Sequence, residues 1–245
     1  MAPPRRVALF VSCLTDQFGA RAAWATVRLL RRHGVEVEVP AGQTCCGQPG
    51  FSTGMHAEAR AVAGGFVAVF RDHEVVVTPS GSCAAMVREH YRRLFHGHPG
   101  AAAAAALAPR VRELAEFLVH DLGVTALDRV GEGSVFLHQA CHGLRGLGLQ
   151  DEHHRLLELA GYTVVASEEA VCCGFGGAFS IAYPAISGAM LEERIRAAVD
   201  SGARALVSGD TGCLMHLEGG LRRQGVALPV LHLAEALDPA RGAAG

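Results

Sequence analysis

The sequence contains no lysine, and all 22 of its basic residues are arginine. We interpret this absence, together with the abundance of alanine and glycine, as compositional bias. Charged residues make up only 19% of the chain, and the formal net charge is -2. Such a balance gives no reason to expect nucleic acid or an anionic membrane as a partner. No apolar stretch approaches the roughly 20 residues that a membrane-spanning helix requires.

The opening segment "MAPPRRVALFVSCL" also lacks part of what an export signal needs. Its apolar run is short, and no small-residue cleavage site follows it. The same run is equally typical of a buried strand. We therefore expect a cytoplasmic protein, in which thiols stay reduced and clustered cysteines indicate metal or redox chemistry.

Cysteines are plentiful, although no Cys-x-x-Cys pair occurs anywhere. The eight cysteines are Cys13, Cys45, Cys46, Cys83, Cys141, Cys172, Cys173 and Cys213. The last four follow the first four, in order, by 128, 127, 127 and 130 residues. A near-constant offset of this kind indicates an internal duplication. The flanking sequences agree: "CCGQPGFS" aligns with "CCGFGGAFS", "PSGSC" with "GDTGC", and "ELAEFL" with "HLAEAL".

The hydrophobic pattern predicts an α/β fold for each repeat. Apolar, β-branched runs precede Cys13, Cys83, Cys141 and Cys213, which is typical of parallel strands covered on both faces. Helical patterns run over 15–33 and 152–160, each followed by a glycine that suits a helix C-terminus. The low-complexity segment 96–110 is expected to be helical or flexible.

This order predicts two tandem, duplicated, doubly wound (Rossmann-like) domains, with cysteine loops at the carboxyl ends of the strands. We place the domains at 1–127 and 128–245. In open α/β sheets, ligands bind along the carboxyl edge. The topology therefore predicts that the four thiols of each repeat converge, the first four in one half and the last four in the other.

Four thiolates per half match the ligand count of an iron–sulfur cluster. Gly47 and Gly174 follow the cysteine pairs and would allow the backbone to approach a bulky inorganic core. Cys83 and Cys213 are expected to open helices, whose free N–H groups favour an anionic group. Zinc is the main alternative, because four thiolates also form a structural zinc site. However, zinc sites often use the Cys-x-x-Cys spacing that this chain lacks.

Other interpretations of these residues are weaker. A lone buried cysteine is more often a small hydrophobic residue than a ligand, but the duplication reverses that preference here. The histidines His138 and His142 flank Cys141 without counterparts around Cys13. We expect them to be structural or solvent-facing, with His142 able to hydrogen-bond to a ligand. The "GFGG" stretch lacks the Lys-Ser/Thr of a phosphate loop.

The duplicated pattern Cys-x31-Cys-Cys-Gly-x35-Cys and Cys-x30-Cys-Cys-Gly-x38-Cys resembles the cysteine-rich CCG domain family. That family includes the cysteine-rich subunit of heterodisulfide reductase and the iron–sulfur subunits of glycolate and anaerobic glycerol-3-phosphate dehydrogenases. The similarity is greatest to stand-alone members that act in lactate utilization. It implies clusters of the [4Fe-4S] type, one per half, in an electron-transfer subunit. It also implies two partners, lactate utilization proteins B and C, in a complex that oxidises L-lactate to pyruvate, with glycolate as the alternative substrate.

One departure from the family pattern limits what the resemblance implies. Many members carry a fifth cysteine, three residues before the last one, where this chain has Ser80 and Asp210. Five-cysteine sites in heterodisulfide reductase cleave a disulfide substrate. Losing the fifth thiol in both halves favours ordinary electron transfer over heterodisulfide reduction, which stays as the alternative function.

Overall fold

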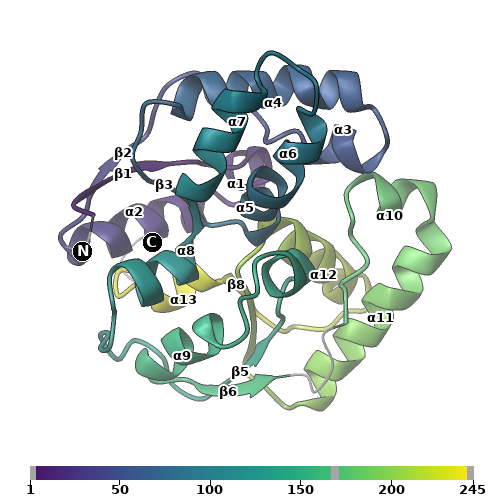
Figure 1. Ribbon diagram of the computed structural model, residues 1–245. Coiled ribbons are helices and arrows are strands. Elements are labelled where there is room, and N and C mark those ends of the chain that lie inside the picture. Colours follow the sequence, from purple (N-terminus) through teal and green to yellow (C-terminus); the bar gives the residue numbers. More distant parts are fainter. Residues whose placement is uncertain (1–3, 167–170, 242–245) are drawn as a thin grey trace.

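The computed structural model describes residues 4–166 and 171–241 and contains two four-stranded parallel sheets (Figure 1). The first sheet has the order β2 (Glu36–Glu38), β1 (Arg6–Leu9), β3 (Val76–Thr78), β4 (Val111–Glu113). The second has the same order, β6 (Thr163–Ala166), β5 (Ser134–Leu137), β7 (Ala205–Ser208), β8 (Val230–His232). We call 6–121 the first half and 134–241 the second half. The predicted fold class and its duplication are confirmed.

The central strands are short and almost wholly buried. All residues of β3 and β7 are buried, as expected of parallel strands with helices on both faces. The registers correspond as well, since Ala8 of β1 pairs with Val76 and Phe136 of β5 pairs with Leu206. Each pair places the first and third strands of a half side by side.

The helices of the first half are α1 (Cys13–Phe18), α2 (Ala20–Arg32), α3 (Gln48–Ser52), α4 (His56–Phe70), α5 (Gly81–Ala85), α6 (Tyr91–Leu94), α7 (Ala101–Leu107) and α8 (Leu114–Glu116). Those of the second half are α9 (Glu152–Leu159), α10 (Ala178–Ala182), α11 (Pro184–Asp200), α12 (Thr211–Arg223) and α13 (Leu233–Leu237). The 3-10 helix η2 (Ala108–Arg110) and the π-helical turns η1 (Met86–His90), η3 (Phe117–Asp121) and η4 (His142–Gly146) complete the set.

Two sequence predictions about helices have different outcomes. The predicted single helix over 15–33 is wrong, because the chain breaks at Gly19 into α1 and α2. A Cβ atom at Gly19 would lie 3.0 Å from Thr211 Cγ2, so the break lets α1 pack closely against α12. The low-complexity segment does form a helix, α7, which buries Ala104 and Leu107.

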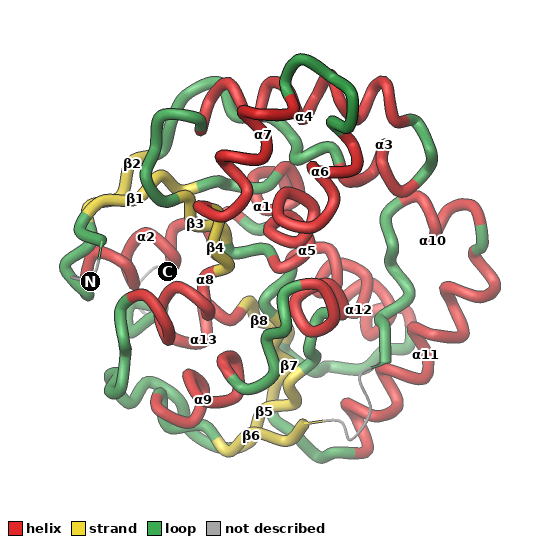
Figure 2. The backbone as a smooth tube through the Cα atoms, viewed as in Figure 1, coloured by secondary structure: helices red, strands yellow, loops and turns green. Residues whose placement is uncertain are grey.

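Three hydrophobic clusters fill the structure. The largest draws on both halves and includes Leu30, Leu118, Leu156 and Leu237. Two smaller clusters involve α4 in the first half and α11 with α12 in the second. The last helix of each half also contacts the first long helix of the other, α13 against α2 and α8 against α9 (Figure 2). The two halves therefore share the largest of the three clusters.

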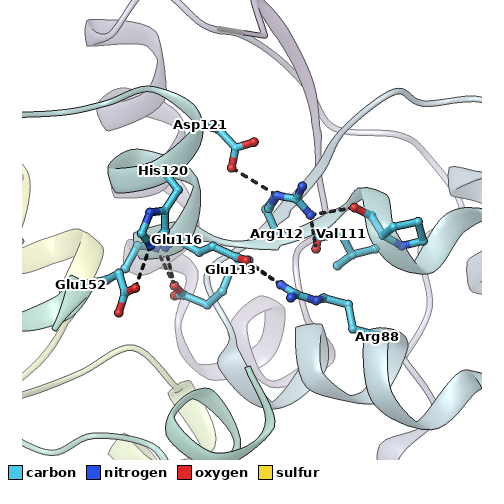
Figure 3. Close-up of polar contacts among 10 residues, drawn as sticks. Arg88, Val111, Arg112, Glu113, Glu116, His120, Asp121 and Glu152 are labelled. Carbon is cyan, nitrogen blue, oxygen red and sulfur yellow. Dashed lines mark hydrogen bonds and ion pairs between the residues drawn. The ribbon is translucent and has the colours of Figure 1, made fainter. Parts of the chain in front are cut away.

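Polar contacts also join the halves around the end of the first sheet. His120 lies 2.7 Å from Glu152 at the start of α9, beside the Arg88–Glu116 ion pair of the same length (Figure 3). Residues 123–133 then cross between the sheets without a helix or strand. The division into 1–127 and 128–245 falls in this segment and stays a prediction. Within the described ranges, no helix combines the length and apolar character needed to cross a membrane.

Candidate metal centre

The eight cysteines follow the first three strands of each half. Cys13 opens α1 after β1, Cys45 and Cys46 lie in the loop after β2, and Cys83 lies in α5 after β3. The second half repeats this arrangement after β5, β6 and β7. In both sheets the first and third strands are neighbours. The second strand lies on one side of this pair and the fourth on the other, so the strand order switches sides between the first and third strands. This is where open parallel sheets bind ligands.

The first cysteine set (Cys13, Cys45, Cys46 and Cys83) forms a chain of sulfur contacts. The Cys13 thiol donates to Cys45 Sγ at 3.6 Å, and the Cys46 thiol donates to Cys83 Sγ at 3.4 Å. The backbone N–H of Gly47 donates to Cys45 Sγ at 3.4 Å. Cys46 and Cys83 are buried, whereas Cys13 is exposed. The predicted convergence of these four residues is therefore seen in the structure.

The second cysteine set (Cys141, Cys172, Cys173 and Cys213) repeats this geometry. The Cys141 thiol donates to Cys172 Sγ at 3.9 Å, and the N–H of Gly174 donates to the same sulfur at 3.4 Å. Cys173 and Cys213 are buried. A nitrogen of His138 and the two sulfurs of Cys173 and Cys213 all lie within 4.8 Å of one another.

The two glycines after the cysteine pairs are required by the backbone. Gly47 and Gly174 adopt φ angles of 87° and 86°, which side chains other than glycine rarely adopt. A Cβ atom on Gly47 would lie 2.8 Å from the carbonyl oxygen of Ala59, and one on Gly174 would lie 2.6 Å from that of Ser187. Each cysteine loop therefore packs directly on the second helix after it, which is α4 in the first half and α11 in the second.

Further hydrogen bonds fix the two cysteine loops. In the first half the buried Tyr91 hydroxyl donates to the carbonyl of Cys46 at 2.9 Å. In the second half the Ser187 hydroxyl donates to the carbonyl of Gly174 at 2.8 Å. The two repeats thus use different side chains to hold equivalent loops.

Charge is distributed unevenly within each set. Hydrogen bonds from Cys13 and Cys46, with one from the Gly47 N–H, lower the pKa of Cys45 to about 3. The thiols that donate have raised pKa values: Cys13 through its bond to Cys45, and Cys46 through its bonds to Cys45 and Cys83 together with burial. Each of these hydrogen bonds favours a thiolate at the acceptor and a thiol at the donor.

The second set has the same pattern. Cys172 accepts from Cys141 and Cys173, and its pKa falls to about 2. The pKa of Cys141 is raised by its bond to Cys172 and by burial. The hydrogen bond with Cys173 acts to lower the pKa of Cys213, but burial and the Asp210 carboxylate outweigh it and raise that pKa. The hydrogen bonds therefore favour a thiolate at one cysteine of each set, Cys45 in the first and Cys172 in the second.

The positions without a fifth cysteine join the two halves. Ser80 caps α5 and Asp210 caps α12, so Cys83 and Cys213 each lie in a first helical turn, as predicted. Asp210 Oδ2 accepts hydrogen bonds from the Ser80 hydroxyl at 3.3 Å and from the Ser82 N–H at 3.0 Å. The repeat pattern indicates only that a fifth thiol is missing at these two positions, and nothing in it shows that they meet.

Both cysteine sets line a single cavity of about 580 Å³. Its wall includes all eight cysteines, together with Leu14, Phe175, Ile181 and Asp210. The sequence predicted one convergence point in each half, and the structure adds that the two points face each other across a common space.

The two histidines near Cys141 differ in their surroundings. His142 Nδ1 lies 3.8 Å from Cys141 Sγ, and its Nε2 lies 3.3 Å from the Gln48 amide of the other half. His138 is 1% exposed, so of the two expected roles, structural or solvent-facing, the second is wrong for this residue. Burial, with the positive charge of Arg194, lowers the pKa of His138 to about 4.

The donor sets fit a soft metal or an iron–sulfur group. The sulfur–sulfur distances of 3.4 to 3.9 Å are close to the ~3.8 Å edge of a tetrahedron with metal–sulfur bonds of about 2.3 Å. These contacts join pairs of thiols. Among the described residues, the group whose ligand atoms all lie within 4.8 Å of one another is His138, Cys173 and Cys213, so the four thiols of a set do not enclose a single ion as they stand. A multi-iron core is larger and fits if the thiols separate towards the cavity that they line.

Comparisons with known proteins agree with the duplication. The CCG family, described as "Cysteine-rich domain", matches twice, over residues 7–88 and 135–218. The chain is 41% identical over 236 residues to "Lactate utilization protein A" of Macrococcus caseolyticus, covering 95% of this chain and 96% of that protein. It is 42% identical to the protein of the same name from Geobacillus kaustophilus, covering 95% of this chain and 98% of the other.

Among solved structures, a hypothetical protein from Helicobacter pylori matches 96% of this chain with a TM-score of 0.55 at 14% identity. This chain spans 49% of that protein's chain. At this identity the likeness concerns the fold alone.

Proposed function

The chain belongs to the CCG cysteine-rich domain family, and we propose that it is the iron–sulfur electron-transfer subunit of a complex that oxidises L-lactate to pyruvate. One observation carries the proposal: two sets of four converging thiols face one cavity at the carboxyl edges of duplicated sheets. The relatives named Lactate utilization protein A match over nearly their full length, which supports lactate as the substrate of the complex.

In this proposal the first and second cysteine sets each hold one cluster, of the [4Fe-4S] type. One-electron oxidation and reduction is the chemistry that bound clusters supply. The chain's own residues bind and insulate that group. The N–H groups of Gly47 and Gly174 point at sulfur and stabilise negative charge there. The Ser80–Asp210 contact holds the two sets at a fixed separation.

The chemistry of the hydroxy acid is assigned to partners. Removing a hydroxyl proton requires a free base within hydrogen-bond reach of the substrate. Among the described residues that line the cavity, the carboxylate is that of Asp210. Its oxygens already accept hydrogen bonds from Gly212, Ser82 and Ser80. The imidazole of the cavity wall, that of His142, contacts Cys141 Sγ and the Gln48 amide through its two nitrogens. Lactate utilization proteins B and C are therefore the proposed sites of lactate oxidation.

The test is electron delivery between purified components under anaerobic conditions. We expect that L-lactate, in the presence of proteins B and C, bleaches the visible absorbance of this protein and yields pyruvate. The chain alone should not respond. Glycolate, tested in parallel, distinguishes the alternative substrate. Bleaching by lactate without the partners, or no bleaching with both partners present, would contradict the assigned role.

A second function, reduction of a thiol or heterodisulfide substrate at this site, is favoured by the shared cavity of about 580 Å³, which could admit a small molecule between the two sets. It requires a spare thiol or an open coordination position, whereas the fifth-cysteine positions are Ser80 and Asp210. Turnover of a heterodisulfide by the isolated chain with an artificial electron donor separates the two functions. We expect no turnover.

A further inference from the structure

The two halves carry different residues at the matching positions that directly follow β1 and β5. The 128-residue offset aligns Phe10 with His138, and Phe66 with Arg194. The aligned glycine contacts support this match, because Gly47 packs on the carbonyl of Ala59 and Gly174 on that of Ser187, which are also 128 residues apart. In the first half, Phe10 packs edge-on against Phe66, with ring centroids 4.8 Å apart.

In the second half this aromatic pair is replaced by two buried polar side chains. His138 is 1% exposed and Arg194 is 3% exposed. The guanidinium of Arg194 lies over the Phe136 ring, 5.2 Å from its centroid. A repeat that could bury two phenylalanines instead buries an imidazole, which is costly unless the imidazole has a partner.

Neither ring nitrogen of His138 has a hydrogen-bond partner within the described part of the chain. An unsatisfied buried donor or acceptor destabilises a fold. Its neighbours with metal-binding atoms are Cys173 and Cys213, all within 4.8 Å of one another. The unpartnered ring nitrogens of His138 therefore lie next to sulfur atoms of the second cysteine set.

We propose that His138 donates a ring N–H hydrogen bond to a sulfur atom of the group held by the second cysteine set, a bond that the first set lacks. The inference rests on the proposed function in that this set holds a cluster. His138 acts as a donor and not as a ligand because both sets already supply four thiols. It is thus a positioning and tuning residue.

The expected consequence is a difference between the two clusters. A hydrogen bond to cluster sulfur stabilises the reduced, more negatively charged state, so the second cluster should have the higher reduction potential. An electron would then rest preferentially in the second half. The matching side chain in the first half, Phe10, has no N–H group to donate.

The test compares the wild type with His138→Phe, which restores the residue type of the first half, and with His138→Gln, which keeps an N–H donor. Thr78→Val is the control, because it removes another buried, unpartnered polar atom, in the first half. Iron content and a redox titration followed by electron paramagnetic resonance are measured for each. We expect His138→Phe to retain iron in both sets and to lower one of the two potentials.

His138→Gln should recover part of that shift, and Thr78→Val should leave the second potential unchanged. Equal potentials in the wild type, or no shift in His138→Phe, would overturn the inference. If His138→Phe fails to fold, the wild type alone still tests the inference, because two clusters of equal reduction potential would overturn it.

A separate measurement with Co²⁺ alone distinguishes failure of the inference from failure of the proposed function. Cobalt bound by thiolates absorbs in the visible whether or not the site natively holds a cluster. If the purified protein lacks iron, the proposed function fails, and the cobalt spectrum still tests His138. A second-set cobalt band that does not shift in His138→Phe overturns the inference, as does a wild type that binds no cobalt.

Discussion

Gly174→Ala is the substitution that tests most sharply how the second cysteine loop is built. The change introduces two costs. An alanine at a φ of 86° is disfavoured by about 1–2 kcal/mol. Its Cβ would also lie 2.6 Å from the carbonyl oxygen of Ser187 and 3.0 Å from Met190 Cβ. Forced contacts of this kind destabilise a packed structure by about another 1–3 kcal/mol.

Gly202→Ala is the matched control. Gly202 is exposed and has a φ of 65°, with no atom within 4 Å of the added Cβ. It should lose only the conformational part, about 1–2 kcal/mol. For a chain of this size each kcal/mol lowers the Tm by about 2–4 °C. We therefore expect a Tm about 2–8 °C below wild type for Gly202→Ala and about 2–12 °C lower again for Gly174→Ala.

Metal content provides the second readout of Gly174→Ala. The N–H of Gly174 donates to Cys172 Sγ at 3.4 Å, so moving this loop away from Ser187 displaces a proposed ligand. Metal bound by the second set should fall while that of the first set persists. Gly202→Ala should bind metal as the wild type does. Equal Tm values and equal metal contents for the two variants would refute the close packing of the cysteine loop on α11 as the reason for its glycine.

Four other perturbations test the same geometry. Cys46→Ser and Cys173→Ser should each remove metal from their own set only, since a hydroxyl poorly replaces a soft thiolate; loss of all iron in either variant would mean that one group spans the cavity. On exposure to air, the first cluster should be lost first, as followed by electron paramagnetic resonance, because Cys13 is exposed whereas its counterpart is half-buried; equal loss rates would contradict this. Tyr91→Phe removes the hydroxyl that donates to the Cys46 carbonyl and should weaken Co²⁺ binding by the first set. The control is Tyr162→Phe, which removes a hydrogen bond to the Ala236 carbonyl and should leave Co²⁺ binding by the first set unchanged. Co²⁺ affinity should rise with pH between about 6 and 8, because the donor thiols in each set have raised pKa values and must release protons to bind the metal. A Co²⁺ affinity that falls over this range would contradict the protonation states assigned to these thiols.

The sequence predicts much of this architecture for a physical reason. Buried parallel strands need continuous apolar runs, and the runs before Cys13, Cys83, Cys141 and Cys213 became β1, β3, β5 and β7. The parallel topology then brings residues at their carboxyl ends together. Repeat spacing also identifies Gly47 and Gly174, whose φ angles are positive in the structure.

The features that sequence analysis missed depend on contacts between the halves or on departures from the repeat. The break at Gly19 follows from packing against Thr211 in the other half. The Ser80–Asp210 bond and the shared cavity likewise require knowledge of how the two sheets face each other. The sequence analysis names His138 as a residue without a counterpart, but it does not show that the aligned residue, Phe10, belongs to the core. A polar residue that aligns with a core aromatic in the other repeat is the signal that could have identified it.

The proposal that each cysteine set holds an iron–sulfur cluster is best tested by metal analysis of the anaerobically purified protein, with electron paramagnetic resonance after reduction. We expect about eight iron and eight acid-labile sulfide atoms per chain, as for two [4Fe-4S] clusters, with visible absorbance and two reducible signals. About two zinc ions per chain, with no iron and no visible absorbance, would contradict the proposal. In that case the converging thiols would form structural zinc sites.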